Sequence, residues 1–254
     1  MSAVTYRGTG EPSRRRARTA SRGKLYLGAA VSMALVAFAG FVPSYWAPLA
    51  AGTLALHPVV HVHGVLFFLW MLYFVAQAAL AADGRTGRHR KLGLLGIALA
   101  AVMVFSGILV QTVNLAAGLR GPQPEVARYV AALGFSAMLM FTTFVALAIA
   151  NVRRPQIHRR LMVLASFAII GAAVVRLMRF VPETTLADRV LLGTFVVDGL
   201  LVVLVLLDRR AAGRVHPVWL AGGGFLVANQ AVRAVIADTA PWIGFTAWLA
   251  SLAG

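Results

Sequence analysis

The sequence predicts an all-α integral membrane protein, a bundle of seven transmembrane helices, and three observations support this prediction. Hydrophobic residues make up 60% of the 254 residues and charged residues only 13%, whereas a soluble domain usually carries about 25% charged residues. The apolar residues fall into seven long runs, each near the roughly 20 residues that a helix needs to cross the hydrocarbon core of a bilayer. Lys and Arg gather in the tail and in alternate connections between the runs, as they do in polytopic membrane proteins.

The predicted architecture has three parts. Residues 1–24 form a basic tail that we expect to be disordered, residues 25–237 form the transmembrane domain, and residues 238–254 form a short interfacial amphipathic helix on the outer side. The seven predicted spans are 25–44, 58–81, 92–115, 129–150, 161–181, 189–207 and 217–237.

Local signals mark the ends of two of these spans. Pro58 suits the first position of a helix, so His57 is expected to cap the second span. Val181 precedes Pro182, and a residue before proline avoids the helical region, so the fifth span should end there.

The basic residues predict the orientation of the bundle. The tail and the loops 83–91, 151–160 and 208–216 hold 18 of the 24 Lys and Arg residues. Because Lys and Arg are retained in cytoplasmic loops, the N-terminus should lie in the cytoplasm, with the chain in a bacterial inner membrane. The net charge of +16 therefore does not indicate a nucleic-acid partner, since no predicted helix offers a basic face to a groove.

The chain has no cysteine. This excludes disulfides, iron–sulfur clusters, thiolate metal ligands and covalently attached c-type haem. Any metal ion must therefore be held by histidine, carboxylate or methionine side chains.

Several polar side chains fall within the outer halves of the second, third, fifth and seventh spans, and Asp198 lies close to the middle of the sixth. An ionisable side chain inside a bilayer costs roughly 2.5–3.5 kcal/mol on insertion scales, so such residues usually face a partner or a cavity. We therefore expect an outer-leaflet pocket shared by these spans. Its candidate residues are His57, His61, His63, Arg176, Arg179, Arg233 and Asp198, with Gln111, Asn114, Asn229 and Gln230 in a second tier.

Helix geometry limits what the three histidines of the second span can do together. His57 and His61 are four residues apart, so they share a helix face and could hold one metal ion. His61 and His63 are about 200° apart around a helix, so they cannot both point into one site. The alternative for these histidines is a location in the headgroup region or an interhelical hydrogen bond.

The arginines and the remaining histidines also have structural alternatives. Arg179 is close enough to the boundary to extend its side chain to the interface, and a salt bridge to Asp198 would explain either Arg176 or Arg233. Three other histidines, His89, His158 and His216, stand among arginines at the cytoplasmic boundary, where contact with lipid headgroups is expected.

The motifs "HPVVHVHGVLFF", "GRHRKLG" and "RRPQIHRRLM" within residues 57–180 resemble a bacterial family of multi-pass membrane proteins of unknown function. The resemblance implies that six residues occupy motif positions: His57, His61, His63, His89, His158 and Arg176. "HRRLM" is also similar to a motif in small membrane proteins linked to haem–copper oxidase assembly. Neither resemblance implies a reaction.

Three hypotheses for function follow. The first is a redox or assembly protein that binds haem b or a His-bound metal ion, with the arginines pairing with propionates; its difficulty is that no second helix offers a histidine at outer depth. The second is a transporter or sensor of a small anionic ligand. The third, ranked lowest, is an enzyme acting on a lipid, with Asp198 or His61 as acid or base. The first is favoured because histidine and arginine recur most often at outer depth, but the sequence leaves open whether the protein is an enzyme and what its oligomeric state is.

Overall fold

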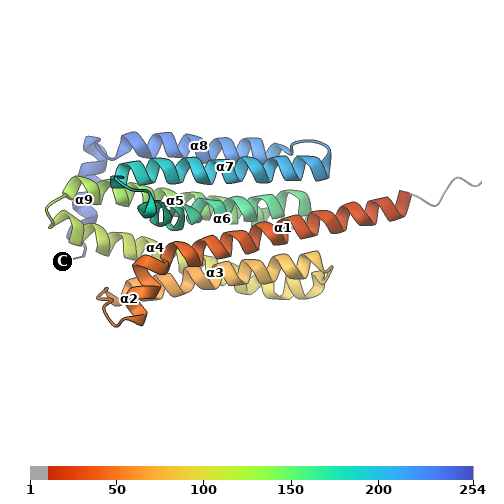
Figure 1. Cartoon of the computed structure of the whole chain (residues 1–254), viewed down its shortest axis with the longest axis horizontal. Coiled ribbons are helices and arrows are strands. Elements are labelled where there is room, and N and C mark those ends of the chain that lie inside the picture. The colour runs from red at the N-terminus through yellow and green to blue at the C-terminus, as the bar shows by residue number, and fades with distance from the viewer. Residues whose placement is uncertain (1–10, 254) are drawn as a thin grey trace, which may run out of the picture.

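The computed structural model describes residues 11–253, with side chains from residue 23 onward (Figure 1). All regular structure in this part of the chain is helical. The helices are α1 (Glu11–Phe41), α2 (Ala47–Ala50), α3 (Pro58–Ala82), α4 (Thr86–Leu119), α5 (Pro124–Ala150), α6 (Pro155–Leu177), α7 (Leu186–Ala212), α8 (Pro217–Ile236) and α9 (Ala240–Ser251). A π-helical turn, Val42–Trp46, joins α1 to α2, and a 3-10 turn, Met178–Phe180, follows α6.

The described residues contain six helices that are long and apolar enough to cross a membrane, and a seventh if α8 and α9 are counted as one bent span. The prediction of an all-helical bundle of long apolar helices is therefore confirmed. Large apolar side chains cover its outside; Leu94, Phe105 and Val235 are 74%, 71% and 70% exposed. Such a surface needs lipid around it, so the chain is a multi-pass membrane protein.

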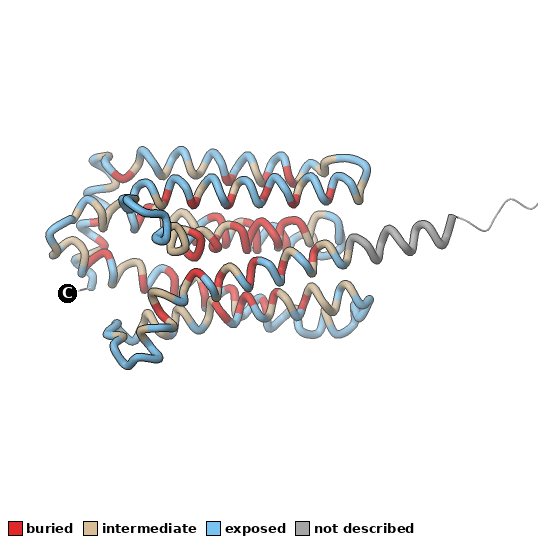
Figure 2. The backbone as a smooth tube through the Cα atoms, in the orientation of Figure 1, coloured by how far each residue is buried: buried red, intermediate tan, exposed pale blue. Residues whose placement is uncertain are grey.

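The long helices run alternately up and down, and the bundle has two distinct ends (Figure 1). One end carries α9 together with the α4–α5 and α6–α7 connections, and we call it the α9 end. The opposite end carries the loops 83–91, 151–160 and 208–216, and we call it the basic-loop end. Helix α6 lies at the centre, because it packs against α1, α5, α7 and α8, and 56% of its apolar stretch is buried, against 22–39% in the other five long helices. Figure 2 shows the buried residues concentrated along α6 and on the sides of its neighbours that face it.

The helix ends follow the sequence signals. His57 is the N-cap of α3, where its Nδ1 accepts a hydrogen bond from the Val59 backbone N–H at 3.2 Å. His216 caps α8 in the same way through the Val218 N–H, also at 3.2 Å. The helical segment after α6 ends at Phe180, directly before Val181 and Pro182. Both the cap at His57 and the stop before Pro182 were predicted.

Two terminal segments differ from the prediction. Helix α1 begins at Glu11, so residues 11–24 are helical and not a disordered tail, while residues 1–10 lie outside the described residues. Helix α9 is bent by 83° from α8 and lies across the end of the bundle against α4. It is not amphipathic, because its exposed side chains, such as Ile243 and Trp248, are as apolar as the buried Leu249.

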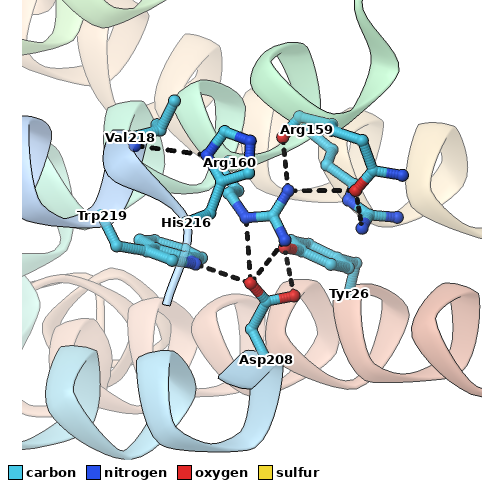
Figure 3. A network of polar contacts seen from close by, with 8 residues as sticks. Tyr26, Arg159, Arg160, Asp208, His216, Val218 and Trp219 are labelled. Atoms are coloured by element: carbon cyan, nitrogen blue, oxygen red, sulfur yellow. Dashed lines mark hydrogen bonds and ion pairs between the residues drawn. The ribbon is translucent and has the colours of Figure 1, made fainter. Parts of the chain in front are cut away.

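A buried ion pair joins four helices at the basic-loop end (Figure 3). The Arg160 guanidinium on α6 donates from Nε and Nη2 to Asp208 Oδ2 on α7, at 2.9 and 2.6 Å. The two side chains are 1% and 0% exposed. Tyr26 Oη on α1 donates to Asp208 Oδ1 at 3.0 Å, and Trp219 Nε1 on α8 donates to Asp208 Oδ2 at 2.8 Å. The Asp208 carboxylate is therefore compensated by charge and fully hydrogen-bonded, as a buried carboxylate requires.

This network was not predicted, because Arg160 and Asp208 stand in segments whose composition indicates basic cytoplasmic loops. The sequence offers no signal that would have found it, because Asp83 is likewise the one acid in a basic connection and its side chain is exposed.

Replacing Asp208 with alanine should lower the free energy of unfolding by about 3–5 kcal/mol, because Arg160 would remain buried without a carboxylate. Asp83→Ala is the matched control, since the ion pair of Asp83 with Arg85, at 3.9 Å, joins side chains that are 57% and 58% exposed. The free energy of unfolding of this control should fall by about 1 kcal/mol or less. Unfolding in detergent micelles measures both changes, and equal losses would contradict the role assigned to the buried pair.

The closest approach of α1 to α6 depends on a glycine. A Cβ added at Gly40 would lie 2.8 Å from the backbone Cα and C atoms of Ala173, which cannot move without shifting α6. Gly40→Ala should therefore destabilise the protein by about 1–3 kcal/mol. Gly28→Ala on the same helix should be neutral or stabilising, because a Cβ there meets nothing within 4 Å. The same unfolding assay compares them, and a Gly40→Ala protein as stable as Gly28→Ala would show that this contact is loose.

Candidate functional site

A cavity of about 550 Å³ opens between the helices in the half of the bundle near the α9 end. Its walls come from the C-terminal halves of α1, α4, α6 and α8 and the N-terminal halves of α3, α5 and α7. The sequence predicted the contributions of α3, α4, α6, α7 and α8 through their polar residues. It missed α1 and α5, because these two helices contribute mainly apolar side chains, such as Phe41 and Met140.

Nine of the eleven residues predicted for an outer-leaflet pocket line this cavity. They are His63, Gln111, Asn114, Arg176, Arg179, Asp198, Asn229, Gln230 and Arg233. The other two, His57 and His61, are not among the lining residues. Arg189, in the first turn of α7, also lines the cavity and was not predicted, because it was assigned to an outer connection.

The arginines of the cavity wall have neutral partners. Arg176 Nη1 donates to the Ala172 carbonyl at 2.9 Å, and its guanidinium lies 4.3 Å from the centre of the Phe41 ring. Arg233 Nη2 donates to Thr194 Oγ1 at 3.0 Å. A cation over an aromatic ring and a hydrogen bond to a hydroxyl each stabilise a guanidinium, but neither neutralises its charge.

The one carboxylate in the cavity wall is also not paired with an arginine. Asp198 Oδ1 accepts a hydrogen bond from Gln230 Nε2 at 2.9 Å. A salt bridge from Asp198 to Arg176 or Arg233, considered from the sequence, is not formed. Among the side chains of residues 23–253, the ion pairs within 4 Å are Arg85–Asp83 and Arg160–Asp208, and neither touches the cavity. The cavity wall thus carries four arginines against one aspartate, a formal charge of +3 before histidine is considered.

The three histidines of α3 have three different environments. His63 lines the cavity, with Nδ1 3.5 Å from Ser106 Oγ on α4. His61 turns toward the end of α1, where its Nδ1 lies 3.0 Å from Tyr45 Oη. The exposed His57 caps α3. The prediction that His61 and His63 point in different directions is confirmed.

Among the described residues, these environments bring together no metal centre with three ligands of the His, Cys, Asp or Glu types. The Nδ1 atoms of His57 and His61 are already occupied by the Val59 N–H and the Tyr45 hydroxyl. Within the part of the chain that the structure describes, no group of three or more His, Cys, Asp or Glu side chains could hold a metal ion. The predicted His57–His61 metal site therefore has no third ligand of these types.

The histidines at the basic-loop end connect helices. His158 Nδ1 donates to the Ala148 carbonyl at 2.9 Å, which ties the start of α6 to the end of α5. The His89 ring lies edge-on to that of His158, with 6.2 Å between ring centres. At the cap of α8, partial burial and then the nearby Arg160 lower the pKa of His216. A neutral ring is what the cap requires, because Nδ1 accepts a hydrogen bond there. Headgroup contact at these histidines stays a prediction.

A comparison of the chain with known protein families, with curated proteins and with solved structures finds no match.

Proposed function

We propose that this protein binds a small anionic ligand in the cavity near the α9 end, as a transporter or sensor. The single observation that supports the proposal is that Arg176 and Arg233 line an intramembrane cavity in which neither forms an ion pair within 4 Å with a described carboxylate, and Asp198 acts on Arg233 only from a greater distance. A guanidinium stays charged under all physiological conditions. One aspartate against four arginines leaves an excess of positive charge in the described wall, which is unfavourable inside a bilayer, so an anionic ligand would supply the missing negative charge.

The chemistry of the wall suits such a ligand. Each guanidinium offers several N–H donors in a planar fork that matches carboxylate and phosphate groups. Neutral amides at Gln111, Asn114 and Asn229 add donors that fix orientation without adding charge. A volume of about 550 Å³ lies within the range of roughly 300–1,000 Å³ typical of small-molecule sites.

The proposed orientation places this cavity on the outer side of the membrane. The tail and the three loops of the basic-loop end hold 18 of the 24 Lys and Arg residues, and this bias favours the cytoplasm for that end. The ligand would then enter from the outer side of a bacterial inner membrane.

Haem b or a single metal ion is the second candidate for the same cavity. It is supported by His63 and by Met138, which both lie beside Gly107, since histidine and methionine are haem ligands. The anion is favoured over haem because His63 is the one histidine among the described lining residues. The arginines also need an anionic partner whether or not haem is bound.

Binding of inorganic phosphate, butyl phosphate and hexanoate to the purified protein tests the primary proposal. At least one of these anions should raise the thermal unfolding temperature. Arg176→Gln and Arg233→Gln should each weaken its binding about 10- to 100-fold, because a hydrogen bond to a charged group contributes about 1.5–3 kcal/mol. Arg210→Gln is the matched control, since Arg210 is exposed at the basic-loop end, and it should bind as the unchanged protein does. Stabilisation that persists in both cavity variants would contradict the proposal.

The visible spectrum and metal content of protein purified from haem-replete cells test the second candidate. Bound haem should give a Soret band that His63→Ala removes and His57→Ala leaves intact, because His57 lies outside the cavity. A colourless, metal-free preparation would eliminate this candidate and leave the anion proposal unaffected.

A further inference from the structure

The cavity is polar near the α9 end and apolar toward the middle of the bundle. On α6, the lining residues run from Phe167 and Ile170 to Arg176. The rise of 1.5 Å per residue puts Phe167 about 13 Å deeper than Arg176. On α7, Arg189 lines the cavity in the first turn, and Leu201 lines it about 18 Å further along the helix. Asp198 is the polar exception on this wall, about 13 Å from Arg189, where it accepts a hydrogen bond from Gln230.

The lining residues of the other helices also change from polar near the α9 end to apolar at greater depth. On α8, Leu226 lies seven residues, about 10 Å, deeper than Arg233. On the helices that enter from the α9 end, the deepest lining residues are Met71 of α3 and Met140 of α5. The deep end of the cavity is therefore enclosed by methionine, leucine and phenylalanine side chains. Flexible methionines in such a wall adapt to apolar ligands of varied shape.

The deep part of the cavity is also open space. Gly171 lies in the C-terminal third of α6, five residues or about 7 Å deeper than Arg176. It lines the cavity, and a Cβ built on it would meet no atom within 4 Å. An apolar space that no side chain fills leaves its lining without contact partners on one side. An apolar group of the right width would restore those contacts.

We infer that the ligand is a single-chain anionic amphiphile, with a carboxylate or phosphate head and an apolar tail. The head lies between Arg176 and Arg233, and the tail extends along the apolar wall of α6 toward Phe167. This inference rests on the proposed function, because it uses the same arginines. It adds the tail, which the apolar deep end and the open space at Gly171 require.

A chain-length series tests the inference. Binding of n-alkyl phosphates and n-alkyl carboxylates with 4 to 12 carbons is measured by calorimetry on protein in nanodiscs, at concentrations below micelle formation. Each added methylene should tighten binding about fourfold until the tail fills the cavity, after which affinity should level off. The two series identify the head group, and n-alkanols of equal length measure partition into the bilayer alone.

Gly171→Leu is the variant that separates the tail from the head. A leucine at position 171 would fill the open space, so the affinity for long-chain anions should fall at least tenfold. The affinity for butyl phosphate or butyrate should stay unchanged. Gly199→Leu on α7 is the matched control, because that position is exposed, does not line the cavity and meets nothing within 4 Å. Gly199→Leu should leave the affinities for all anions of the chain-length series unchanged.

The outcomes distinguish this inference from the proposed function. Short anions that bind with no dependence on chain length would overturn the amphiphile and leave the anion site standing. Alkanols that bind as tightly as the matching anions, with no effect of Arg176→Gln, would overturn both. Long-chain binding that Gly171→Leu and Gly199→Leu reduce equally would also overturn the placement of the tail.

Discussion

A charged side chain that leaves water must be compensated inside the protein, and this constraint explains both ends of the bundle. At the basic-loop end, Arg160 is 1% exposed and is neutralised by Asp208, which is hydrogen-bonded by side chains from two further helices. Near the α9 end, Arg176 and Arg233 have an aromatic ring, a carbonyl and a hydroxyl as partners. The same residue type is thus fully compensated at one end and only partly at the other. The difference supports the proposal that a molecule outside the chain completes the second end.

The two ends also differ in how firmly they join the helices. The Arg160–Asp208 network joins α1, α6, α7 and α8 around one carboxylate. Around the cavity, the hydrogen bonds described above link helices only in pairs, α7 with α8 through Gln230 and Arg233, and α3 with α4 through His63. The Arg160–Asp208 network therefore joins four helices at one point, whereas each hydrogen bond described around the cavity joins two.

The polar lining of the cavity could largely be predicted from the sequence, because the depth of a residue in the membrane follows from its position along a transmembrane helix. Of the eleven candidate residues chosen by their predicted depth, nine line one cavity. The helical periodicity of α3 also predicted that the side chains of His61 and His63 point in different directions. The buried pair was not accessible in this way, because Arg160 and Asp208 are 48 residues apart and both stand in segments whose composition indicates exposed loops. Apolar walls such as Phe41 and Met140 carry no signal that distinguishes a cavity lining from ordinary packing. The length of α1 was missed because arginine-rich sequence was expected to lack structure.

The most direct measurement of the central claim is a crystal structure of the protein with a brominated alkyl phosphate, whose bromine is located by its anomalous scattering. We expect the phosphate within hydrogen-bonding distance of both Arg176 and Arg233, with the bromine in the apolar part of the cavity. Guanidinium groups turned outward to lipid headgroups, with no anion between them and the cavity closed by side chains, would contradict it.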